Sequence, residues 1–524
     1  MNFSYNLISQ PWIPVLTKNG DYKNIDMKEC LINAQEYLDL KDPYPIVNSA
    51  IFRLLIAMLI DIFRPNTSID FENLLKDKYK ENEIENYLIK YFERFDIFDK
   101  QKPFYQISDD RVKPKPALKM VHHYASGNNA TLFDHHTETD GVGLKPDQAA
   151  RFLITIQAFG LSGLSGISEK FTNAPISNII SFYLKGANLF ETLYLNLVSY
   201  NQDRNGFFPS DERDKPFWRL DDPFRSRNIP YGLLDYLTWM NRRIILYPED
   251  ENGRIVVRKI KEAPGLRLDE DYIDGAKIHD PFVYYRNTKD GPKPLKFRVD
   301  RALWRDSASL FRYERQDEGT NLDEVIPIET VLNLRKLIKR NVLPMDKTFF
   351  LQAVGMASDK AKILFYRSEE LPLPLEYVND RNLLFKLHSA LSYAEKISHK
   401  LFGAIREFAR IATEIRQNKE EGEKKEKPKL SLDGEKLLNH LNAERFYWIN
   451  AERGFLNLLE MLPKDDTAAI SDWIIHINSS AINALESAIA LAGNSPKFLK
   501  AQVHAAKILY GGMEKLNSGK ENAE

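Results

Sequence analysis

The chain has 524 residues, of which 43% are hydrophobic and 28% are charged, and its formal net charge is −1. This composition is typical of a soluble globular protein, and the length exceeds what one ordinary hydrophobic core fills, so we expect more than one domain. A net charge near zero argues against a protein that coats nucleic acid unaided, so any nucleic-acid contact should depend on local patches or partner molecules. The single cysteine, Cys30, excludes an intrachain disulfide framework and a zinc site of several thiolates.

The N-terminal region mixes strand and helix signals. Asn19-Gly20 predicts a tight hairpin turn, and Asp26 predicts the N-cap of a helix over residues 26–40. The apolar segment 48–63 carries charged residues, so we interpret it as a buried core helix and not as a membrane span. A further amphipathic helix is predicted over residues 70–95. The N-terminus lacks a basic segment followed by an apolar run, which indicates no signal peptide and, with the cysteine content, a cytoplasmic protein.

The middle of the chain alternates irregular and regular segments. Residues 100–147 have no strong period and hold several prolines and glycines, which is typical of a long functional or disordered loop. Residues 145–160 predict a helix, since Pro146 suits a first turn and Gly160 suits an end. Strand patterns follow in the segments RIILYP, GRIVVRKI, PFVYYRN and LKFRVD, and residues 349–374 predict a strand, a loop and a second strand.

The composition changes after residue 378, where proline almost vanishes and amphipathic helical patterns dominate. The predicted helices lie near residues 380–417, 432–462, 465–492 and 496–517, with a charged linker at 418–429. Short connections between the later helices indicate an antiparallel four-helix bundle. The predicted fold class is therefore α+β: a large, irregular, mixed domain over residues 1–378, followed by an all-α four-helix bundle over residues 379–524.

Two pairs of histidines in the irregular segment raise the question of metal chemistry. His122 and His123 precede His135 and His136, with Asp134 beside the second pair, and a metal-dependent hydrolase could use His135, His136 and Asp134. Adjacent residues on an extended chain point to opposite sides, however, and no HExxH or His-x-x-x-His spacing preorganises a zinc. We favour a polar loop in which one histidine caps or packs, with no metal and no cofactor. No Gly-x-Ser-x-Gly elbow occurs, so we predict no catalytic residues.

The glycine cluster GLSGLSG permits a close approach of the backbone to another surface. Gly160, Gly163 and Gly166 recur every three residues, with Ser162 and Ser165 between them. The cluster lacks the Lys-Ser/Thr of a phosphate-binding P-loop. Main-chain amides and the two hydroxyls could meet a partner or a nucleic-acid backbone, and a tight structural turn is an equal alternative.

The segment YYRNTKDGPKPLKFR interleaves cations with aromatic residues. Its cations are Arg286, Lys289, Lys293, Lys296 and Arg298. Such a segment suits phosphate contact, which depends on salt concentration. A solvated hairpin explains the same composition and is modestly favoured on composition alone.

The segment GMASDKAKILFYR predicts a small-residue turn between two strands. Ala357, Ser358 and Asp359 form this turn, which presents Lys360 between the two strands. A polar hairpin tip can enter a groove, although an ordinary surface hairpin has the same pattern.

Several segments, taken in order, resemble the CasA family, the large subunit of the type I-E CRISPR Cascade complex. They are YNLISQPWIPVLTKNG, AIFRLLIAMLI, LFDHH, AARFLITIQAFG before the glycine cluster, YGLLDYLTWMNRRIILYPE, and VGMASDKAKILFYRSEELPLPLE. The resemblance covers nearly the whole chain and includes the helical C-terminal region.

The resemblance implies a non-catalytic subunit of a crRNA-guided complex of antiviral defence. Such a subunit reads the protospacer-adjacent motif (PAM) of double-stranded target DNA from the minor groove and helps to open the duplex. It then recruits the Cascade-associated helicase-nuclease. Its implied partners are target DNA, crRNA, the other Cascade subunits and that nuclease, without a membrane. Because the guide supplies sequence specificity, a neutral protein with a few basic loops suffices.

The family's contact residues map onto this sequence by position. The loop that approaches the minor groove matches Gly160 to Gly166, the PAM-contacting lysine matches Lys289 or Arg286, and the wedge hairpin matches Ser358 to Ala361. The loop that contacts crRNA and neighbouring subunits matches Thr131, Leu132, Phe133, Asp134, His135, His136, Thr137, Glu138, Thr139 and Asp140.

The sequence departs from some family members in two respects. Lys360 stands where some carry glutamine at the wedge tip, which leaves the preferred PAM open. A cysteine-rich metal-binding insertion is impossible with one cysteine. A scaffold whose helical bundle docks other proteins, without DNA contact, is the remaining alternative.

Overall fold

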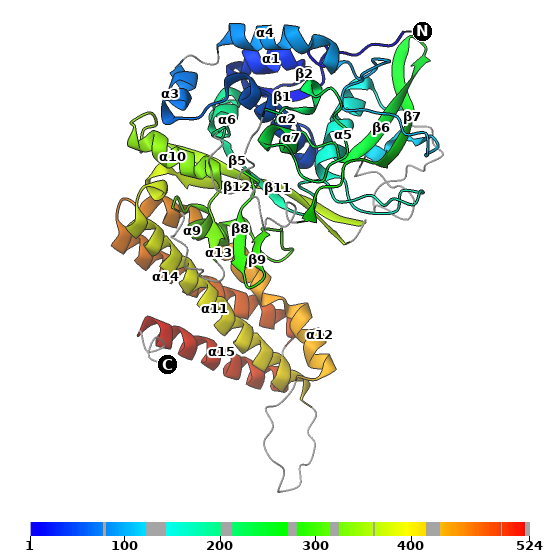
Figure 1. The fold of residues 1–524 in the computed structure, drawn as a ribbon. Coiled ribbons are helices and arrows are strands. Elements are labelled where there is room, and N and C mark those ends of the chain that lie inside the picture. Colours follow the sequence, from blue (N-terminus) through cyan, green and yellow to red (C-terminus); the bar gives the residue numbers. More distant parts are fainter. Residues whose placement is uncertain are drawn as a thin grey trace. The chain divides into compact units, whose positions relative to one another are not determined.

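The computed structural model of the chain describes residues 2–76, 80–121, 143–200, 212–270, 280–314, 324–359, 362–414, 430–493 and 495–518. The chain divides into two compact units. The first unit comprises Met1–Val299 and Leu310–Asn379, and the second comprises Asp300–Ser309 and Asp380–Glu524 (Figure 1). Residues 300–309, which the sequence grouped with the first domain, belong to the second unit. The α+β fold class is confirmed: strands lie in the first unit and long helices fill the second.

The described part of the first unit holds four small sheets, each of three strands, in the orders β2-β1-β3, β4-β7-β6, β12-β11-β5 and β10-β8-β9. The strands are β1 (Ile13–Thr17), β2 (Tyr22–Ile25), β3 (Tyr37–Leu40), β4 (Lys115–Pro116), β5 (Ile180–Lys185), β6 (Arg242–Glu251), β7 (Arg254–Pro264), β8 (Tyr285–Thr288), β9 (Gly291–Pro294), β10 (Val325–Ile326), β11 (Thr348–Asp359) and β12 (Lys362–Pro374). The helices are α1 (Met27–Ile32), α2 (Pro45–Phe63), α3 (Ser68–Lys76), α4 (Glu81–Tyr91), α5 (Pro146–Phe159), α6 (Leu189–Leu195), α7 (Leu233–Leu237) and α10 (Glu329–Lys339).

Helix α2 forms the centre of the first unit. It is long and apolar enough to pass a test for a membrane span, but 83% of the tested window is buried inside the protein, as expected for a core helix. Its charged residue Arg53 is fully enclosed and pairs with Asp280, with 2.7 Å between Nη1 and Oδ2. Pairing with a buried carboxylate is what allows a cation to stay in such a core.

Local signals predicted some elements correctly and others wrongly. Asp26 caps α1, since its Oδ1 accepts from the backbone N–H of Glu29 at 2.8 Å. The predicted helix over residues 26–40 is wrong in its second half, because residues 37–40 form β3 beside β1. The helix predicted over residues 70–95 is instead two helices, α3 and α4. The segment LKFRVD is not a strand either; the strand precedes it as β9.

The second unit is a bundle in which α11 (Arg381–Thr413) packs with α15 (Pro496–Asn517), and α13 (Ala443–Met461) packs with α14 (Asp466–Ala492). The helix predicted over residues 432–462 is interrupted, so that α12 (Leu432–Leu441) precedes α13. Asn442 makes the break with a left-handed backbone, φ 41° and ψ 43°, a conformation that ends a helix.

Residues 300–309 complete the core of the bundle. The Trp304 ring lies 5.0 Å from the ring of Phe455, centroid to centroid, and 5.7 Å from that of Trp448. Arg305 forms an ion pair with Glu395 of α11, with Nη2 and Oε2 2.7 Å apart. This segment, in which the short helix α9 (Ser307–Leu310) begins, therefore belongs to the bundle by packing, although it is distant from the bundle in sequence.

Candidate nucleic-acid interface

Two of the predicted contact elements meet at Ile180, the first residue of β5. Its backbone N–H donates to the carbonyl oxygen of Leu295 at 3.0 Å, and Leu295 directly follows the β8–β9 hairpin. On the opposite edge of the strand Ile180 pairs with Gly355 of β11. The glycine cluster leads into β5 along the chain. One strand end thus positions elements that are far apart in sequence.

The glycine cluster is the first half of a returning loop, residues 160–174. Gly160 ends α5, and its carbonyl oxygen accepts from the Ala174 N–H at 2.7 Å. Gly163 and Phe171 exchange backbone hydrogen bonds of 2.9 and 3.2 Å across the loop. The Ser162 N–H donates to Asn173 Oδ1 at 2.8 Å. The stem is therefore closed by its own backbone, which fixes the tip between the two arms.

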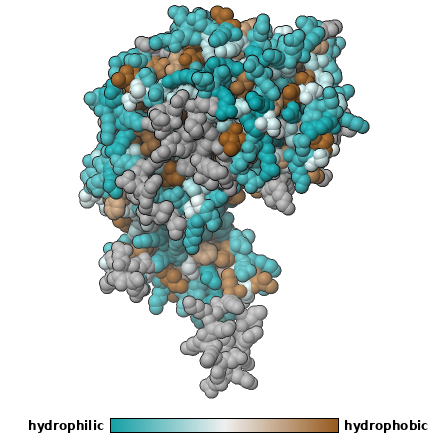
Figure 2. Space-filling model, viewed as in Figure 1, coloured by the Kyte–Doolittle hydropathy of each residue, from teal (hydrophilic) through white to brown (hydrophobic). Residues whose placement is uncertain are grey.

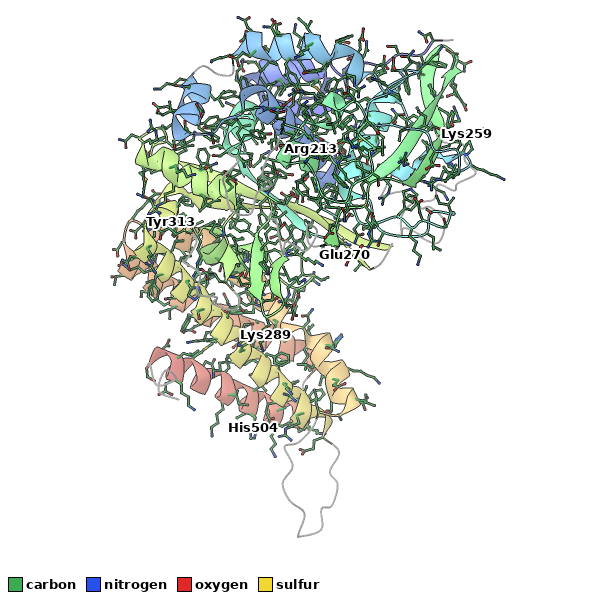
Figure 3. All side chains as sticks on the ribbon, in the orientation of Figure 1. Arg213, Lys259, Glu270, Lys289, Tyr313 and His504 are labelled. Atoms are coloured by element: carbon green, nitrogen blue, oxygen red, sulfur yellow. The ribbon has the colours of Figure 1, made fainter. Side chains whose placement is uncertain are left out.

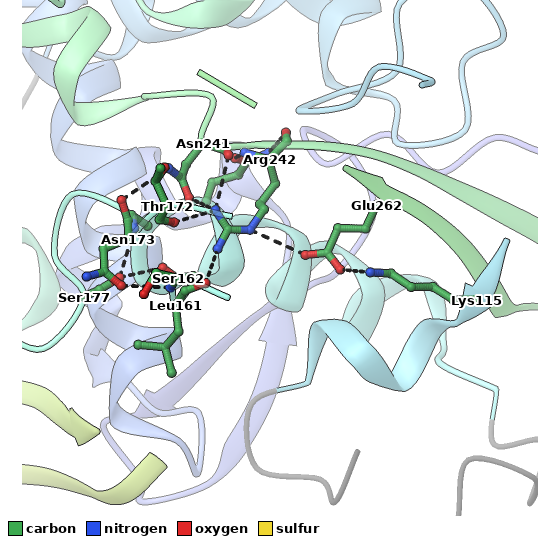
Figure 4. Close-up of polar contacts among 12 residues, drawn as sticks. Lys115, Leu161, Ser162, Thr172, Asn173, Ser177, Asn241, Arg242 and Glu262 are labelled. Atoms are coloured by element: carbon green, nitrogen blue, oxygen red, sulfur yellow. Dashed lines mark hydrogen bonds and ion pairs between the residues drawn. The ribbon is translucent and has the colours of Figure 1, made fainter. Parts of the chain in front are cut away.

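The buried Arg242 at the start of β6 joins both arms of the loop (Figure 4). Its Nη2 donates to the Leu161 carbonyl at 2.7 Å, and its Nη1 donates to the Thr172 carbonyl at 3.0 Å. The guanidinium carbon also lies 4.7 Å from the centre of the Phe171 ring. An added Cβ on Gly160 would lie 2.8 Å from Arg242 Nη2, so only glycine leaves room for this contact.

A buried carboxylate balances the charge of Arg242. Glu262 Oε1 lies 3.5 Å from Arg242 Nε, and the other oxygen of Glu262 pairs with Lys115. Burial lowers the pKa of the Arg242 guanidinium to about 10, and Glu262 opposes that shift. Gln157 of α5 fixes the backbone of Arg242 with hydrogen bonds of 2.8 and 3.0 Å. The loop is thus attached to α5, β6 and β7 together.

The tip of the loop is exposed, in contrast to its stem. Leu164 is 86% exposed, and Gly166 has a positive φ of 86° that favours glycine. Arg111 holds the returning arm, because its Nη1 lies 2.6 Å from Glu169 Oε1. The same guanidinium, by hydrogen bonding, lowers the pKa of Asp109 to about 2, so Asp109 stays charged and fixes Arg111.

The β11–β12 hairpin projects beyond its sheet (Figure 1). Strand β11 pairs with β12 through Asp359 but with β5 only as far as Gly355, so the hairpin continues as a two-stranded ribbon. A register shift just before Ser358 adds local twist. Ser358 and Asp359 end β11, whereas Lys360 and Ala361 lie outside the described residues.

The two basic candidates of the third element differ in position. Lys289 lies at the turn of the β8–β9 hairpin and is exposed (Figure 3). Arg286 is half-buried within β8. In the strand register its backbone lies opposite Lys293 of β9 on one side and Val325 of β10 on the other. Of the two, Lys289 is the side chain that a ligand can reach without a rearrangement of the sheet.

The remaining predicted residues lie outside the described part of the chain. They include the whole segment Thr131 to Asp140 and the four histidines considered as metal ligands. Within the described residues, no group of three or more histidine, cysteine, aspartate or glutamate side chains is arranged to hold a metal ion. Cys30 is buried.

Arg242 and Arg111 are functional candidates that the sequence did not indicate. Arg242 is followed by a strand pattern, and nothing in its spacing relates it to glycines about eighty positions earlier. Arg111 lies in a segment without a period. Only the tertiary structure brings these guanidinium groups to the loop.

The visible surface around the described elements is mostly hydrophilic, with apolar residues scattered singly (Figure 2).

Comparison with known proteins gives a consistent result across the whole chain. The family described as CRISPR-associated protein Cse1 matches residues 6–484. The CRISPR-associated protein CasA/Cse1 of Thermus thermophilus is 29% identical over 514 residues, which are 95% of each chain. A crystal structure of CasA from Thermus thermophilus is 25% identical, with a TM-score of 0.78, and covers 98% of this chain and 100% of that one.

Other solved structures share the fold at lower identity. Thermobifida fusca Cse1 is 22% identical, with a TM-score of 0.79 over 98% of both chains. A chain of a structure named CRISPR RNA-guided surveillance complex is 20% identical, with a TM-score of 0.75 over 97% of this chain and 99% of that one. Because the family match spans residues 6–484 of this chain and the curated relative aligns with 95% of it, the chain belongs to the CRISPR-associated Cse1 (CasA) family.

Proposed function

We propose that the protein is the non-catalytic large subunit of a type I-E CRISPR surveillance complex, the Cascade complex. In this role it reads a short PAM in duplex DNA from the minor groove, helps to open the duplex for pairing with crRNA, and recruits a helicase-nuclease. Its partners are then crRNA, the other subunits, target DNA and the nuclease. Membership of the Cse1 family and the likeness to a chain of an RNA-guided surveillance complex support this assignment.

The observation that carries the proposal is that the β8–β9 and β11–β12 hairpins meet at Ile180, in the strand that follows the glycine loop along the chain. Ile180 hydrogen-bonds to Leu295, which follows the β8–β9 hairpin, and pairs with Gly355, where the β11–β12 hairpin leaves its sheet. A reader of a short motif needs this arrangement, because a few groups must meet adjacent base pairs while guide pairing supplies the remaining specificity.

The glycine loop has the properties of a minor-groove contact. Beyond the Gly163–Phe171 bonds, the backbone of Gly166 is open to close approach, and Leu164 is the exposed large side chain of the tip. Arg242 holds the stem, so little conformational entropy remains to be lost on binding. Because the minor groove distinguishes mainly A·T from G·C pairs, such a reader tolerates several PAM sequences.

The β11–β12 ribbon is suited to act as a wedge. A two-stranded ribbon that extends past its sheet can enter a distorted groove, and unstacking one base step costs about a few kcal/mol. Ser358, Asp359, Lys360 and Ala361 would form the inserting tip. Lys360 offers a cation to phosphates or base acceptors, where an amide would offer a hydrogen bond to either partner.

Lys289 is the basic contact that we assign to the PAM-proximal duplex. It is exposed at a hairpin turn, whereas Arg286 is half-buried within the sheet. The segment from Thr131 to Asp140 is proposed to contact crRNA and neighbouring subunits.

Binding of labelled duplexes by the reconstituted complex tests the proposal. Omission of this chain should abolish the preference for a PAM duplex over a duplex without one. Lys289→Ala and Lys360→Ala should each weaken PAM-duplex binding and reduce the salt slope by about 1 per lost phosphate contact. Lys339→Ala, a change at an exposed lysine of α10, is the matched control and should have no effect.

The outcomes separate the competing functions. PAM discrimination that persists without this chain would refute the proposal. A complex that requires the chain for assembly but shows no PAM preference would support a scaffold. Stoichiometric metal in the purified protein, with loss on His135→Ala, would support the hydrolase instead.

A further inference from the structure

Charge is segregated between the two helix pairs of the second unit. Helices α11 and α15 together carry ten lysine and arginine residues against three acidic ones. Helices α13 and α14 carry two against six. On α13, cations alternate with anions, as in an ordinary solvated face, whereas the α11–α15 pair is strongly positive in a chain whose net charge is −1.

The positive helices are antiparallel neighbours, so their exposed stripes form one surface. Near one end the Phe408 and Phe498 rings lie 6.0 Å apart, and near the other end Tyr393 donates to Asn517 Oδ1 at 2.9 Å. His504 of α15 lies close to α11 (Figure 3) and, after the larger effect of Arg410, helps to lower the pKa of Glu407.

Four cations define the proposed surface, which we call the α11–α15 seam: Lys396, Arg406, Lys500 and Lys507. All four are exposed, and none has a hydrogen-bond or ion-pair partner among the described residues. Lys500 and Lys507, seven residues apart, lie on one face of α15, and Lys396 and Arg406, ten residues apart, lie on adjoining faces of α11. Unpaired, aligned cations keep their full attraction for a polyanion.

Two glycines within the seam are not needed for packing among the described residues. Gly403 lies in the middle of α11 and Gly511 lies within α15, where glycine weakens a helix relative to alanine. A Cβ added to either would meet no described atom within 4 Å, so packing among the described residues does not require them. Because neither residue has a side chain, another backbone can approach the helix closely beside the cations.

Exposed aromatic rings accompany the cations. Tyr510, three residues after Lys507, is 50% exposed, and Phe385 on α11 is 68% exposed. Cations that follow a phosphate backbone, together with rings on which bases stack, are the features of proteins that bind single strands without sequence preference. An acidic protein would also be attracted by the charge, but its binding would not explain why glycines lie beside exposed aromatic rings.

We propose that the α11–α15 seam binds the phosphate backbone of single-stranded DNA, independently of its sequence. The inference extends the proposed function, because a subunit that opens a duplex produces a displaced single strand. It does not require that PAM reading be correct, since the seam lies in the second unit and its affinity can be measured without crRNA.

The test measures binding of a fluorescein-labelled single strand of about 20 nucleotides to the isolated full chain by fluorescence anisotropy. The quadruple variant Lys396→Ala/Arg406→Ala/Lys500→Ala/Lys507→Ala should bind about tenfold more weakly at about 0.1 M salt, and the slope of log K against log salt should fall by about 3. The matched control replaces four exposed lysines of the first unit, Lys41, Lys100, Lys102 and Lys339, by alanine and should bind as the parent does.

A second variant separates binding from folding. Gly511→Gln adds a good helix former into open space, so Tm should rise while the side chain obstructs the seam and weakens binding. Unchanged single-strand affinity in both the quadruple and the Gly511→Gln variants would overturn the proposal, as would equal loss in the control set. Preferential binding of polyglutamate over the single strand would also overturn it and would indicate an acidic protein partner. Failure of PAM discrimination in the assembled complex would leave this result unaffected.

Discussion

Replacement of Arg242 tests how the glycine loop is held. Arg242→Met keeps the approximate side-chain volume but removes the guanidinium that donates to Leu161 and Thr172 on opposite arms. We expect the loop to lose its fixed geometry while α5 and β6 persist, because neither element depends on the guanidinium for its backbone hydrogen bonds. The assembled complex should therefore bind the target duplex more weakly, even under conditions in which the variant remains folded.

The magnitude follows from the burial of the ion pair. Hydrogen bonds from a charged group contribute about 1.5–3 kcal/mol each, and removal of one partner of a buried pair costs about 3–5 kcal/mol. Glu262 keeps Lys115 as a partner, which places the expected loss at the lower limit, about 3 kcal/mol. Arg242→Lys restores charge near Glu262 without the two-armed geometry and should lie between the parent and Arg242→Met.

Urea unfolding measures the stability, and hydrogen exchange of residues 160–174 measures the order of the loop. Arg258→Met on β7 serves as the control, since its ion pair with Glu251 is half-exposed and should contribute less than about 1 kcal/mol. A loss below about 1 kcal/mol in Arg242→Met, with unchanged exchange in the loop, would refute the anchoring role.

Three further changes give independent checks. Gly355→Ala would place a Cβ 2.5 Å from the carbonyl oxygen of Ile179, so the β11–β5 pairing should open and Tm should fall; a normal Tm would show that this approach is not tight. Burial raises the pKa of Asp214 to about 6, so the folded state binds its proton more strongly than the unfolded state. Stability should therefore fall by about 3 kcal/mol as pH rises from about 4 to about 6, and Asp214→Asn should flatten that part of the urea-unfolding profile; an unaltered profile would contradict the assignment. Asn442→Val should destabilise the bundle by about 1–2 kcal/mol in urea unfolding, because a β-branched residue resists the left-handed backbone there, whereas Asn442→Gly should be tolerated.

The sequence predicted those elements whose causes are local. Asp26 caps its helix through its own side chain, and Pro146 with Gly160 marks the limits of α5, because capping involves residues within a few positions of one another. The helical periodicity after residue 378 likewise predicted the bundle, since an apolar stripe can be recognised without knowledge of its partner.

Other features depended on residues distant in sequence. The segment 37–40 has a helical pattern but forms β3, because hydrogen bonding to β1 outweighs a weak local propensity. Residues 300–309 lie far from the bundle in sequence, yet Trp304 and Arg305 complete its core.

The candidate interface shows the same division. The sequence by itself supplied the flexible or basic residues, namely the glycines, Lys289 and the hairpin turn, since their chemistry belongs to single side chains or short spacings. Only the tertiary structure decided that the two hairpins meet at Ile180 and that Arg242 fixes the glycine loop. The physical reason is that hydrogen bonds across a sheet edge and a buried guanidinium act between atoms close in space, and a linear pattern carries no record of that proximity.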